Sequence, residues 1–461
     1  MRHEAKTRSL FSLTWPIFIE TLLYMVMGNA DTLMLSQYSD HAVAAVGVAN
    51  QIIALTIVLF NFVALATAVL VAQYLGARRE QEAVDVSLVS LVANLLFGLL
   101  LSAILAAFSE PILRMMDLPA ELLDEGTHYL AIVGGFLFIQ ALMMTVGAIL
   151  KSYGFTRDTM YVAVGMNVLH IISNAALIFG LFGLPALGIQ GAAISTAASR
   201  GMAFLALLAL LRKRTNIPLA PRAFRRLPFH YLRSLLKIGV PAAGEHLSYN
   251  TAQMVITYFI TWLGAEALTV RVYTQNIMMF VFLFGIAVSQ GTQILVGHFV
   301  GAGRYEEAYA RCLKSLYSAI AISVLLAAAA YWFAEPLLSL FTDDRSMIVL
   351  GRKLLLLTII LEPGRSFNLV IISSLRAAGD VQFPVYMGIL SMWGVGVTIA
   401  YVFGITLGFG LVGIWLSFIA DEWLRGLLML WRWRSRVWMK KTDGATSKNW
   451  RSAAKSNKSC A

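Results

Sequence analysis

The sequence predicts an all-α protein that crosses a membrane many times. Hydrophobic residues make up 59% of its 461 residues, charged residues 13%, and the mean hydropathy is +0.73. Soluble domains carry about 25% charged residues, so this composition excludes a soluble globular protein. Apolar runs of about 20 residues recur along the chain, and each is long enough to cross a bilayer as a helix. Together these observations predict a polytopic membrane protein.

Twelve stretches are long and apolar enough to be transmembrane helices. Two of them, 43–75 and 267–300, exceed one membrane thickness, so their helices are expected to tilt or to project from the bilayer. The first stretch is too long for a cleaved signal peptide and lacks a small-residue cleavage site. The predicted spans are 10–35, 43–75, 84–108, 122–150, 159–180, 188–211, 235–262, 267–300, 312–333, 347–375, 382–404 and 410–431.

The net charge of +11 is distributed unevenly between the loops. Basic residues gather in alternate loops, such as Arg78 and Arg79, while the opposite loops are short and neutral or acidic, as around Asp343. This distribution follows the positive-inside rule and predicts that both termini are cytoplasmic, in a plasma or inner membrane. The basic excess then indicates contact with anionic lipid, and nucleic-acid binding is not expected.

The chain contains an internal repeat in which equivalent residues lie 225 positions apart. FSEPIL at 108–113 returns as FAEPLL at 333–338, and the same offset relates Pro16 to Pro241 and Glu20 to Glu245. Because six helices return the chain to its starting side, the two halves are expected to be parallel repeats. The predicted organisation is an N-lobe at 1–211, a basic cytoplasmic linker at 212–234, a C-lobe at 235–433 and a disordered polar tail at 434–461.

The sequence lacks the motifs that are typical of several functional classes. No GxxxxGK[ST] phosphate loop occurs, so transport would use an ion gradient rather than ATP. Neither HExxH nor GxSxG occurs, so an enzyme is not expected. The chain has two cysteines, which excludes a disulfide framework and a cysteine metal site.

Two carboxylates lie within the first apolar span. Glu20 and Asp31 are eleven residues apart, which places them on one stripe of a helix. Carboxylates at membrane depth are costly and usually functional. Glu20 has a counterpart in Glu245 and is therefore interpreted as part of the architecture, whereas Ile256 holds the position equivalent to Asp31. Asp31 is accordingly the candidate coupling group of the N-lobe, the alternative being a helix end that is partly in water.

Polar residues in the fifth and sixth spans could complete this site. Asn167, His170 and Asn174 share one helical face, and Thr196 follows in the next span. They are expected either to form hydrogen bonds between helices or to form a polar pocket around Asp31. The candidate cation-coupling residues of the N-lobe are Asp31, Glu20, Asn167, His170, Asn174 and Thr196.

The second half carries more intramembrane charge. Glu362 and Arg365 lie one turn apart in the tenth span, and Asp421, Glu422 and Arg425 lie in the twelfth. These residues could neutralise one another as buried pairs. With Glu245 the acids outnumber the arginines, so the surplus charge could instead hold a proton, Na⁺ or a cationic substrate. The candidate cation or substrate residues of the C-lobe are Glu245, Glu362, Arg365, Asp421 and Glu422.

The motifs along the whole chain resemble the multidrug and toxic compound extrusion (MATE) family. They are the PxxxE of the first span with MGNADTLMLSQ, then LVAQYLGARREQEA, LKSYGFTRD, LRAAGDVQFP and GLVGIWLSFIADEWLRGLLML. The resemblance implies twelve helices in two six-helix lobes, V-shaped around a central cavity. It also implies export of amphipathic organic cations in exchange for Na⁺ or H⁺.

The resemblance implies roles for some residues of this chain, and one residue of the family's pattern is missing. Asp31 matches the family's first-helix aspartate, and Thr196 matches a polar position of the sixth helix. Many bacterial members read N-I-x-L-D in the fifth helix, where this chain has His170-Ile-Ile-Ser-Asn174, so the second carboxylate of that site is missing. Glu245 and Glu362 lie on helices where some members carry acids.

The leading functional prediction is an antiporter that exports amphipathic organic cations by alternating access, using H⁺ or Na⁺ and no cofactor. The alternative is a flippase or exporter for a lipid-linked or other amphipathic metabolite, which would favour a cationic cavity. The expected partners are small cationic substrates and the lipid bilayer, and the chain is expected to act as a monomer.

Overall fold

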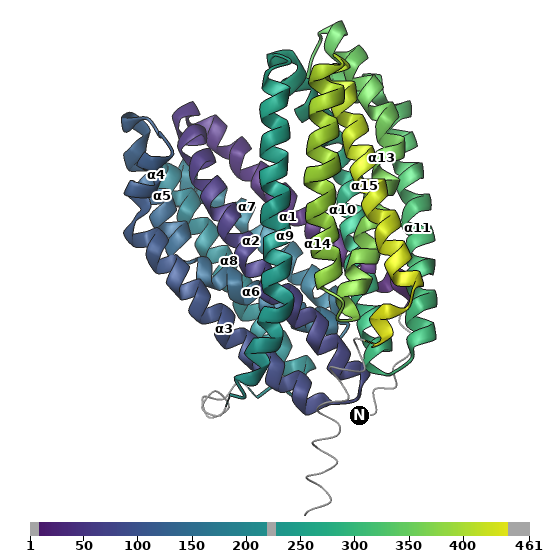
Figure 1. Cartoon of the computed structure of the whole chain (residues 1–461). Coiled ribbons are helices and arrows are strands. Elements are labelled where there is room, and N and C mark those ends of the chain that lie inside the picture. The colour runs from purple at the N-terminus through teal and green to yellow at the C-terminus, as the bar shows by residue number, and fades with distance from the viewer. Residues whose placement is uncertain (1–8, 219–226, 441–461) are drawn as a thin grey trace, which may run out of the picture. The chain divides into compact units, whose positions relative to one another are not determined.

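The fold is described from a computed structural model that covers residues 9–218 and 227–440. Within these residues the chain forms helices joined by short turns and contains no strand. Figure 1 traces the chain from α1 to α15 by colour. The first half contains α1 (Leu10–Tyr38), α2 (Asp40–Gly76), α3 (Glu80–Ala107), α4 (Ser109–Met115), α5 (Ala120–Gly135), α6 (Leu137–Ser152), α7 (Thr156–Phe179), the 3₁₀ turn η1 (Leu181–Gly183) and α8 (Gly188–Arg214).

The second half repeats this order. It contains α9 (His230–Thr261), α10 (Ala265–Gly301), α11 (Tyr305–Trp332), α12 (Ala334–Ser339), α13 (Arg345–Ala377), α14 (Gln382–Ser391), two π-helical stretches, η3 (Met392–Val397) and η4 (Ala400–Thr406), and α15 (Gly410–Arg434).

The twelve predicted spans correspond to helices of the structure, which confirms the predicted fold class. α5 and α6 together form one span, and α14 with its π-helical continuation forms another. In the described part of the chain, ten helical segments are apolar and long enough to cross a membrane. The two remaining spans are α9 and α15, which are of similar length. α15 carries three charged residues near its middle, Asp421, Glu422 and Arg425, and these make it more polar.

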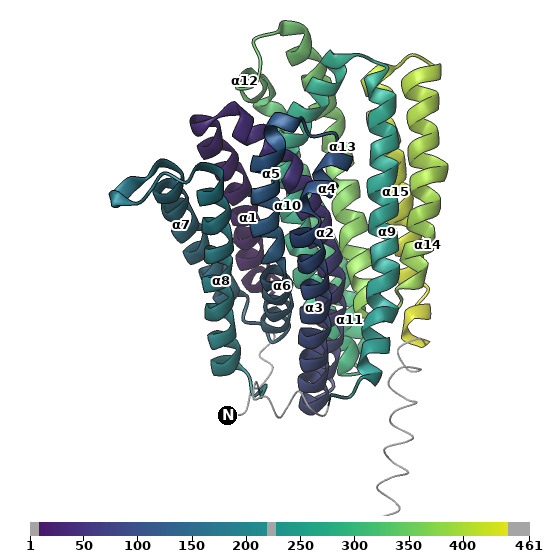
Figure 2. The ribbon, with the colours of Figure 1, turned by 90° about the vertical axis from the view of Figure 1, so that its left-hand side faces the viewer.

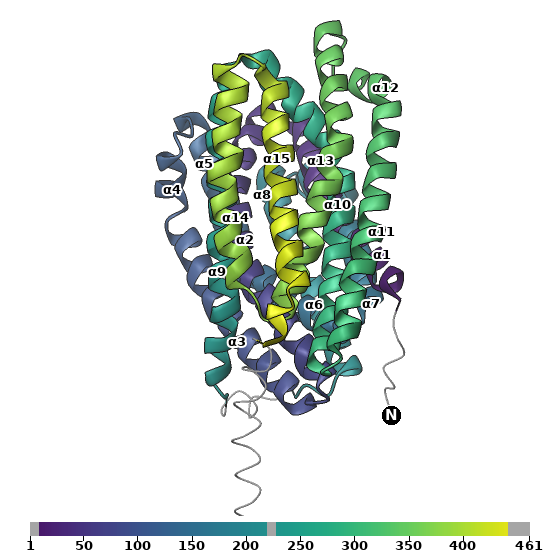
Figure 3. The ribbon, with the colours of Figure 1, turned by 45° about the vertical axis from the view of Figure 1, so that its right-hand side comes forward.

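The helices gather into two compact units. The first unit is Trp15–Gly239, and the second combines the segment that ends at Thr14 with the chain from Val240 onwards. In the first unit α7 and α8 pack side by side, and the turn that contains η1 projects from their ends (Figure 2). In the second unit α15 packs against α13 and α14 (Figure 3). Each unit has its own buried apolar clusters, one around Phe60 and Leu130, another around Val370 and Trp433.

The repeat predicted from the sequence is visible in the backbone. Two residues after the ends of α6 and α13, a glycine lies in the left-handed region, Gly154 with φ of 80° and Gly379 with φ of 84°. Glycine adopts this conformation without the steric penalty of a Cβ atom, so it closes a helix readily. Because the offset that relates Pro16 to Pro241 also relates these two glycines, the same turn is built twice.

The segments outside the spans differ from their predicted limits. α8 continues to Arg214 and α9 begins at His230, so the basic linker is shorter than 212–234, and its residues 219–226 lie outside the described part. Residues 437–440 are helical, and Trp438 is fully buried against Trp433, with ring centroids 4.3 Å apart. The predicted disordered tail from residue 434 is therefore ordered as far as residue 440, because these two tryptophans stack. Residues 441–461 lie outside the described part.

Candidate functional site

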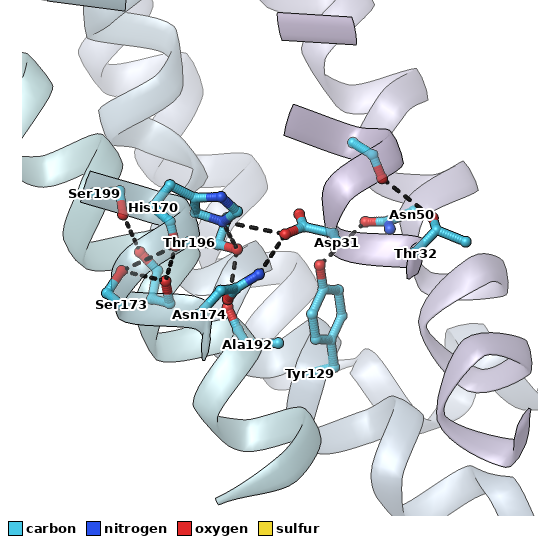
Figure 4. A network of polar contacts seen from close by, with 12 residues as sticks. Asp31, Thr32, Asn50, Tyr129, His170, Ser173, Asn174, Ala192, Thr196 and Ser199 are labelled. Carbon is cyan, nitrogen blue, oxygen red and sulfur yellow. Dashed lines mark hydrogen bonds and ion pairs between the residues drawn. The ribbon is translucent and has the colours of Figure 1, made fainter. Parts of the chain in front are cut away.

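Asp31 lies on α1, two turns before the helix ends at Tyr38. Asp31 is buried, with 8% of its surface exposed to solvent. The Nδ2 of Asn174 donates a hydrogen bond to Asp31 Oδ1 at 2.5 Å, and His170 Nε2 lies 3.4 Å from the same oxygen (Figure 4). Asn174 and His170 are fully buried on one face of α7, as the i, i+4 spacing requires. The structure thus brings these three predicted residues together.

The hydrogen bonds of Thr196 indicate which nitrogen of His170 carries the proton. Thr196 Oγ1 donates to the carbonyl oxygen of Ala192, so its hydroxyl acts as acceptor toward His170 Nε2, 3.2 Å away. We therefore assign the proton to Nε2, from which it also faces Asp31. Asp31 is surrounded by donors, an arrangement that suits an ionised carboxylate.

Two further residues belong to this site, and the sequence analysis missed both. Tyr129 of α5 is 2% exposed, donates to Asn50 at 3.3 Å and interacts electrostatically with Asp31. Arg200 lies on α8 one turn beyond Thr196 and interacts electrostatically with Asp31, Tyr129 and Tyr24. Its Nε is buried without a hydrogen-bond partner among the described residues.

Asn167 and Glu20, the other two predicted residues of the N-lobe, have different hydrogen-bond partners. Asn167 donates to the carbonyl oxygen of Ala163 on its own helix. Glu20 accepts hydrogen bonds from Lys151 Nζ at 2.7 Å and from Thr159 at 2.8 Å.

Glu245 of the second unit repeats the contact of Glu20. It accepts a hydrogen bond from Arg376 at 2.5 Å, and both ion pairs span 131 residues. Lys151 and Arg376 lie in the last turns of α6 and α13 and neutralise the two carboxylates. Glu245 is consequently paired with Arg376.

The second unit contains a buried charge cluster formed by α13 and α15. Glu362 and Arg365 form an ion pair at 2.7 Å. Arg425 lies 2.8 Å from Asp421 and 2.9 Å from Glu422. Arg365 also approaches Glu422 at 3.9 Å, so the five residues form one network.

Neutral side chains complete this cluster. Asn368 donates to Glu422 at 3.0 Å, and Ser391 donates to Asp421 at 2.7 Å. One oxygen of Glu362, Oε2, is buried without a hydrogen-bond partner in the described part of the chain. With all groups ionised, three carboxylates face two guanidinium groups, which leaves one negative charge uncompensated.

The internal repeat relates the two sites. Arg200 and Arg425 occupy equivalent positions of the repeat, and each is followed by a glycine. The two carboxylates that neutralise Arg425 have Thr196 and Ala197 at the equivalent positions. Asp31 is the carboxylate that interacts with Arg200. Arg200 could thus have been found from the sequence as the repeat partner of Arg425.

The described residues contain no group of three or more His, Cys, Asp or Glu side chains placed to hold a metal ion. The chemistry that both sites offer is the binding and release of a proton or a monovalent cation by buried carboxylates.

Comparison with known proteins identifies the family. The MatE family model matches residues 16–176 and again residues 241–402, so its two copies start at the equivalent prolines Pro16 and Pro241. An uncharacterized transporter of Bacillus subtilis, YisQ, is 55% identical and covers 95% of this chain and 96% of its own length. The multidrug resistance protein PmpM of Pseudomonas aeruginosa is 26% identical over 91% of this chain and 89% of its own length.

Solved structures agree on the fold. A MOP superfamily transporter from Pyrococcus furiosus superposes with a TM-score of 0.84 at 20% identity, over 94% of this chain and 96% of its own. The family model and the relatives therefore show that this protein is a membrane transporter of the MATE family.

Proposed function

We propose that the protein exports amphipathic organic cations from the cell by alternating access, in exchange for protons. The observation that carries this proposal is Asp31, a buried carboxylate inside a transmembrane helix, bonded to neutral donors on α7. A charged group at membrane depth is energetically unfavourable, and such groups usually serve a function. Here the function would be to use that charge in each transport cycle. PmpM and other relatives are named multidrug resistance proteins, which supports a drug as cargo.

Protons fit the first unit better than Na⁺. A sodium ion requires several oxygen ligands, whereas Asn174 and His170 present N–H donors to Asp31. The positive charge of Arg200 opposes the binding of any cation at Asp31, so the choice between a proton and Na⁺ rests on the ligands. A proton adds no ligand requirement and neutralises the carboxylate directly.

The second unit supplies the charge for a cationic substrate. Its cluster of Glu362, Asp421 and Glu422 exceeds its two arginines by one negative charge. We propose that an organic cation is attracted to this surplus, and that protonation of Asp31 from outside accompanies its release. Both termini are proposed to be cytoplasmic.

The test is efflux of a cationic dye from vesicles under an imposed proton or Na⁺ gradient. In the wild type the proton gradient should drive efflux and the Na⁺ gradient should not. Asp31→Asn should reduce proton-driven efflux at least tenfold, because the amide cannot take up a proton. Asp124→Asn is the matched control, since the Asp124 side chain is 89% exposed.

Two outcomes would contradict the proposal. Unchanged proton-driven efflux in Asp31→Asn would remove Asp31 from the mechanism. Efflux that ignores both gradients would exclude an antiporter.

A further inference from the structure

Arg271 is a buried arginine that the proposed mechanism does not use. It lies on α10, near the helix start at Ala265, and is 6% exposed. Its Nη1 donates to Thr257 Oγ1 at 2.6 Å, and its Nη2 donates to Gln253 Oε1 at 3.3 Å. Its Nε is buried without a hydrogen-bond partner in the described part of the chain. A guanidinium group has five N–H donors, so donors remain available.

The charge of Arg271 has no carboxylate beside it. Its two hydrogen-bond partners are neutral, and no ion pair joins it to an acid within the described residues. By contrast, Arg425, which is also buried, and the partly buried Arg365 and Arg376 each contact a carboxylate at 3 Å or less. A buried cation without a counter-charge is strongly unfavourable, so the site of Arg271 is suited to receive an anion.

The first unit shows that the fold does not require a cation at this position. The repeat equivalent of Arg271 is Val46, which is 3% exposed in an apolar cluster. The equivalent of Gln253 is Gly28. The arginine and its glutamine acceptor are therefore specific to the second unit, as Asp31 is specific to the first.

Tyr249 links Arg271 to the charge cluster. It lies one turn before Gln253 on α9 and interacts electrostatically with Arg271. It also interacts with Arg365, Arg425 and the two acids of α15. The uncompensated positive charge and the surplus negative charge of the second unit thus have this half-buried tyrosine as a common neighbour.

We propose that Arg271, which Thr257 and Gln253 hold in place as hydrogen-bond acceptors, binds the carboxylate of a zwitterionic amphipathic substrate whose cationic group interacts with the acidic cluster of Glu362, Asp421 and Glu422. The proposal rests on the proposed export function, because it assigns a substrate class to that function. The planar guanidinium group can contact both oxygens of a carboxylate, which favours this anion over a spherical one.

The test uses a zwitterionic rhodamine free acid and its cationic alkyl ester, two dyes that differ in the free carboxylate. Their equilibrium binding to the purified protein is measured by fluorescence polarisation, without any ion gradient. Arg271→Gln should weaken binding of the free acid at least tenfold and change binding of the ester less than twofold. Arg271→Lys should lie between the wild type and Arg271→Gln, because it retains the charge and loses the planar fork. Arg345→Gln is the control, since the Arg345 side chain is 77% exposed.

Several outcomes would overturn the inference. Equal losses for both dyes would show that Arg271 acts through the structure, and no loss for either would show that it is not in the site. Binding of both dyes is also measured in chloride and in gluconate. If the free acid binds as tightly as the ester only in gluconate, where chloride is absent, the site would be assigned to an inorganic anion. Because no gradient is applied, a failure of the antiport proposal leaves this measurement unaffected.

Discussion

Asp31 and Arg200 place opposite charges in one buried region of the first unit. Asp31 could be identified from the sequence because it breaks the repeat, and its partners on α7 could be identified from their helical spacing. Tyr129 could not, because the packing of α5 against α8 brings it there and no local pattern encodes that packing. Asn167 shares the helical face of His170 and yet donates to its own helix, so a common face alone does not define a site.

The positive charge of Arg200 leads to a prediction about ion selectivity. Arg200→Gln removes the charge that opposes a second cation near Asp31, so the variant should gain binding of radioactive Na⁺ that the wild type lacks in this unit. The added binding should disappear in the double variant Arg200→Gln with Asp31→Asn. Arg200→Lys is the control and should bind no additional Na⁺. Added Na⁺ binding that persists without Asp31 would place the ion elsewhere.

At the level of helices, the pattern of apolar runs predicted the ends of nearly all the spans to within a few residues. The reason is that each helix must cover the thickness of the hydrocarbon core with apolar side chains and satisfy its own backbone hydrogen bonds there. The short helices α4 and α12 were not predicted, although both follow the repeated phenylalanine of FSEPIL and FAEPLL. The π-helical stretches after α14 were not predicted either. There Gly413 allows close approach, because a Cβ atom at Gly413 would lie 2.6 Å from the backbone of Phe403.

The repeated Glu–basic pairs connect the first helix of each half to later helices, and they should stabilise the units. The side chains of Lys151 and Glu20 are 19% and 10% exposed. Lys151→Met leaves Glu20 charged and largely buried, and removing one partner of a buried pair costs about 3–5 kcal/mol. We expect a clear fall in the unfolding temperature of the detergent-purified protein and partial recovery in the double variant Lys151→Met with Glu20→Gln.

An exposed ion pair supplies the comparison for this cycle. Arg345 and Glu335 are 77% and 48% exposed, so replacing Arg345 by Met should change the free energy of unfolding by about 0–1 kcal/mol. A double variant no more stable than Lys151→Met alone would show that the Glu20 charge is not what destabilises the single variant.

At the scale of the whole chain, the single offset of the repeat connects the sequence, the backbone and the family match. It relates the paired glycines Gly154 and Gly379, the two Glu–basic pairs and the starts of the two matched segments. The candidate functional residues lie at departures from this symmetry. Asp31 and Arg271 each stand where the other half has an apolar residue, and the arginine shared by both halves has different acidic partners in each. Duplication accounts for the fold, and divergence between the copies accounts for the candidate sites.

The parallel repeat makes a prediction about sidedness that can be tested by labelling single cysteines. In a variant without Cys312 and Cys460, Ala77→Cys and Ala302→Cys occupy equivalent turns, after α2 and after α10. With an even number of spans per half, both should react with a charged, membrane-impermeant maleimide only after the cells are permeabilised. Asp343→Cys, at an exposed position between α12 and α13, should react in intact cells. Reaction of Ala77→Cys and Ala302→Cys from opposite sides would require an inverted repeat, and reaction of both in intact cells would reverse the proposed orientation of the termini.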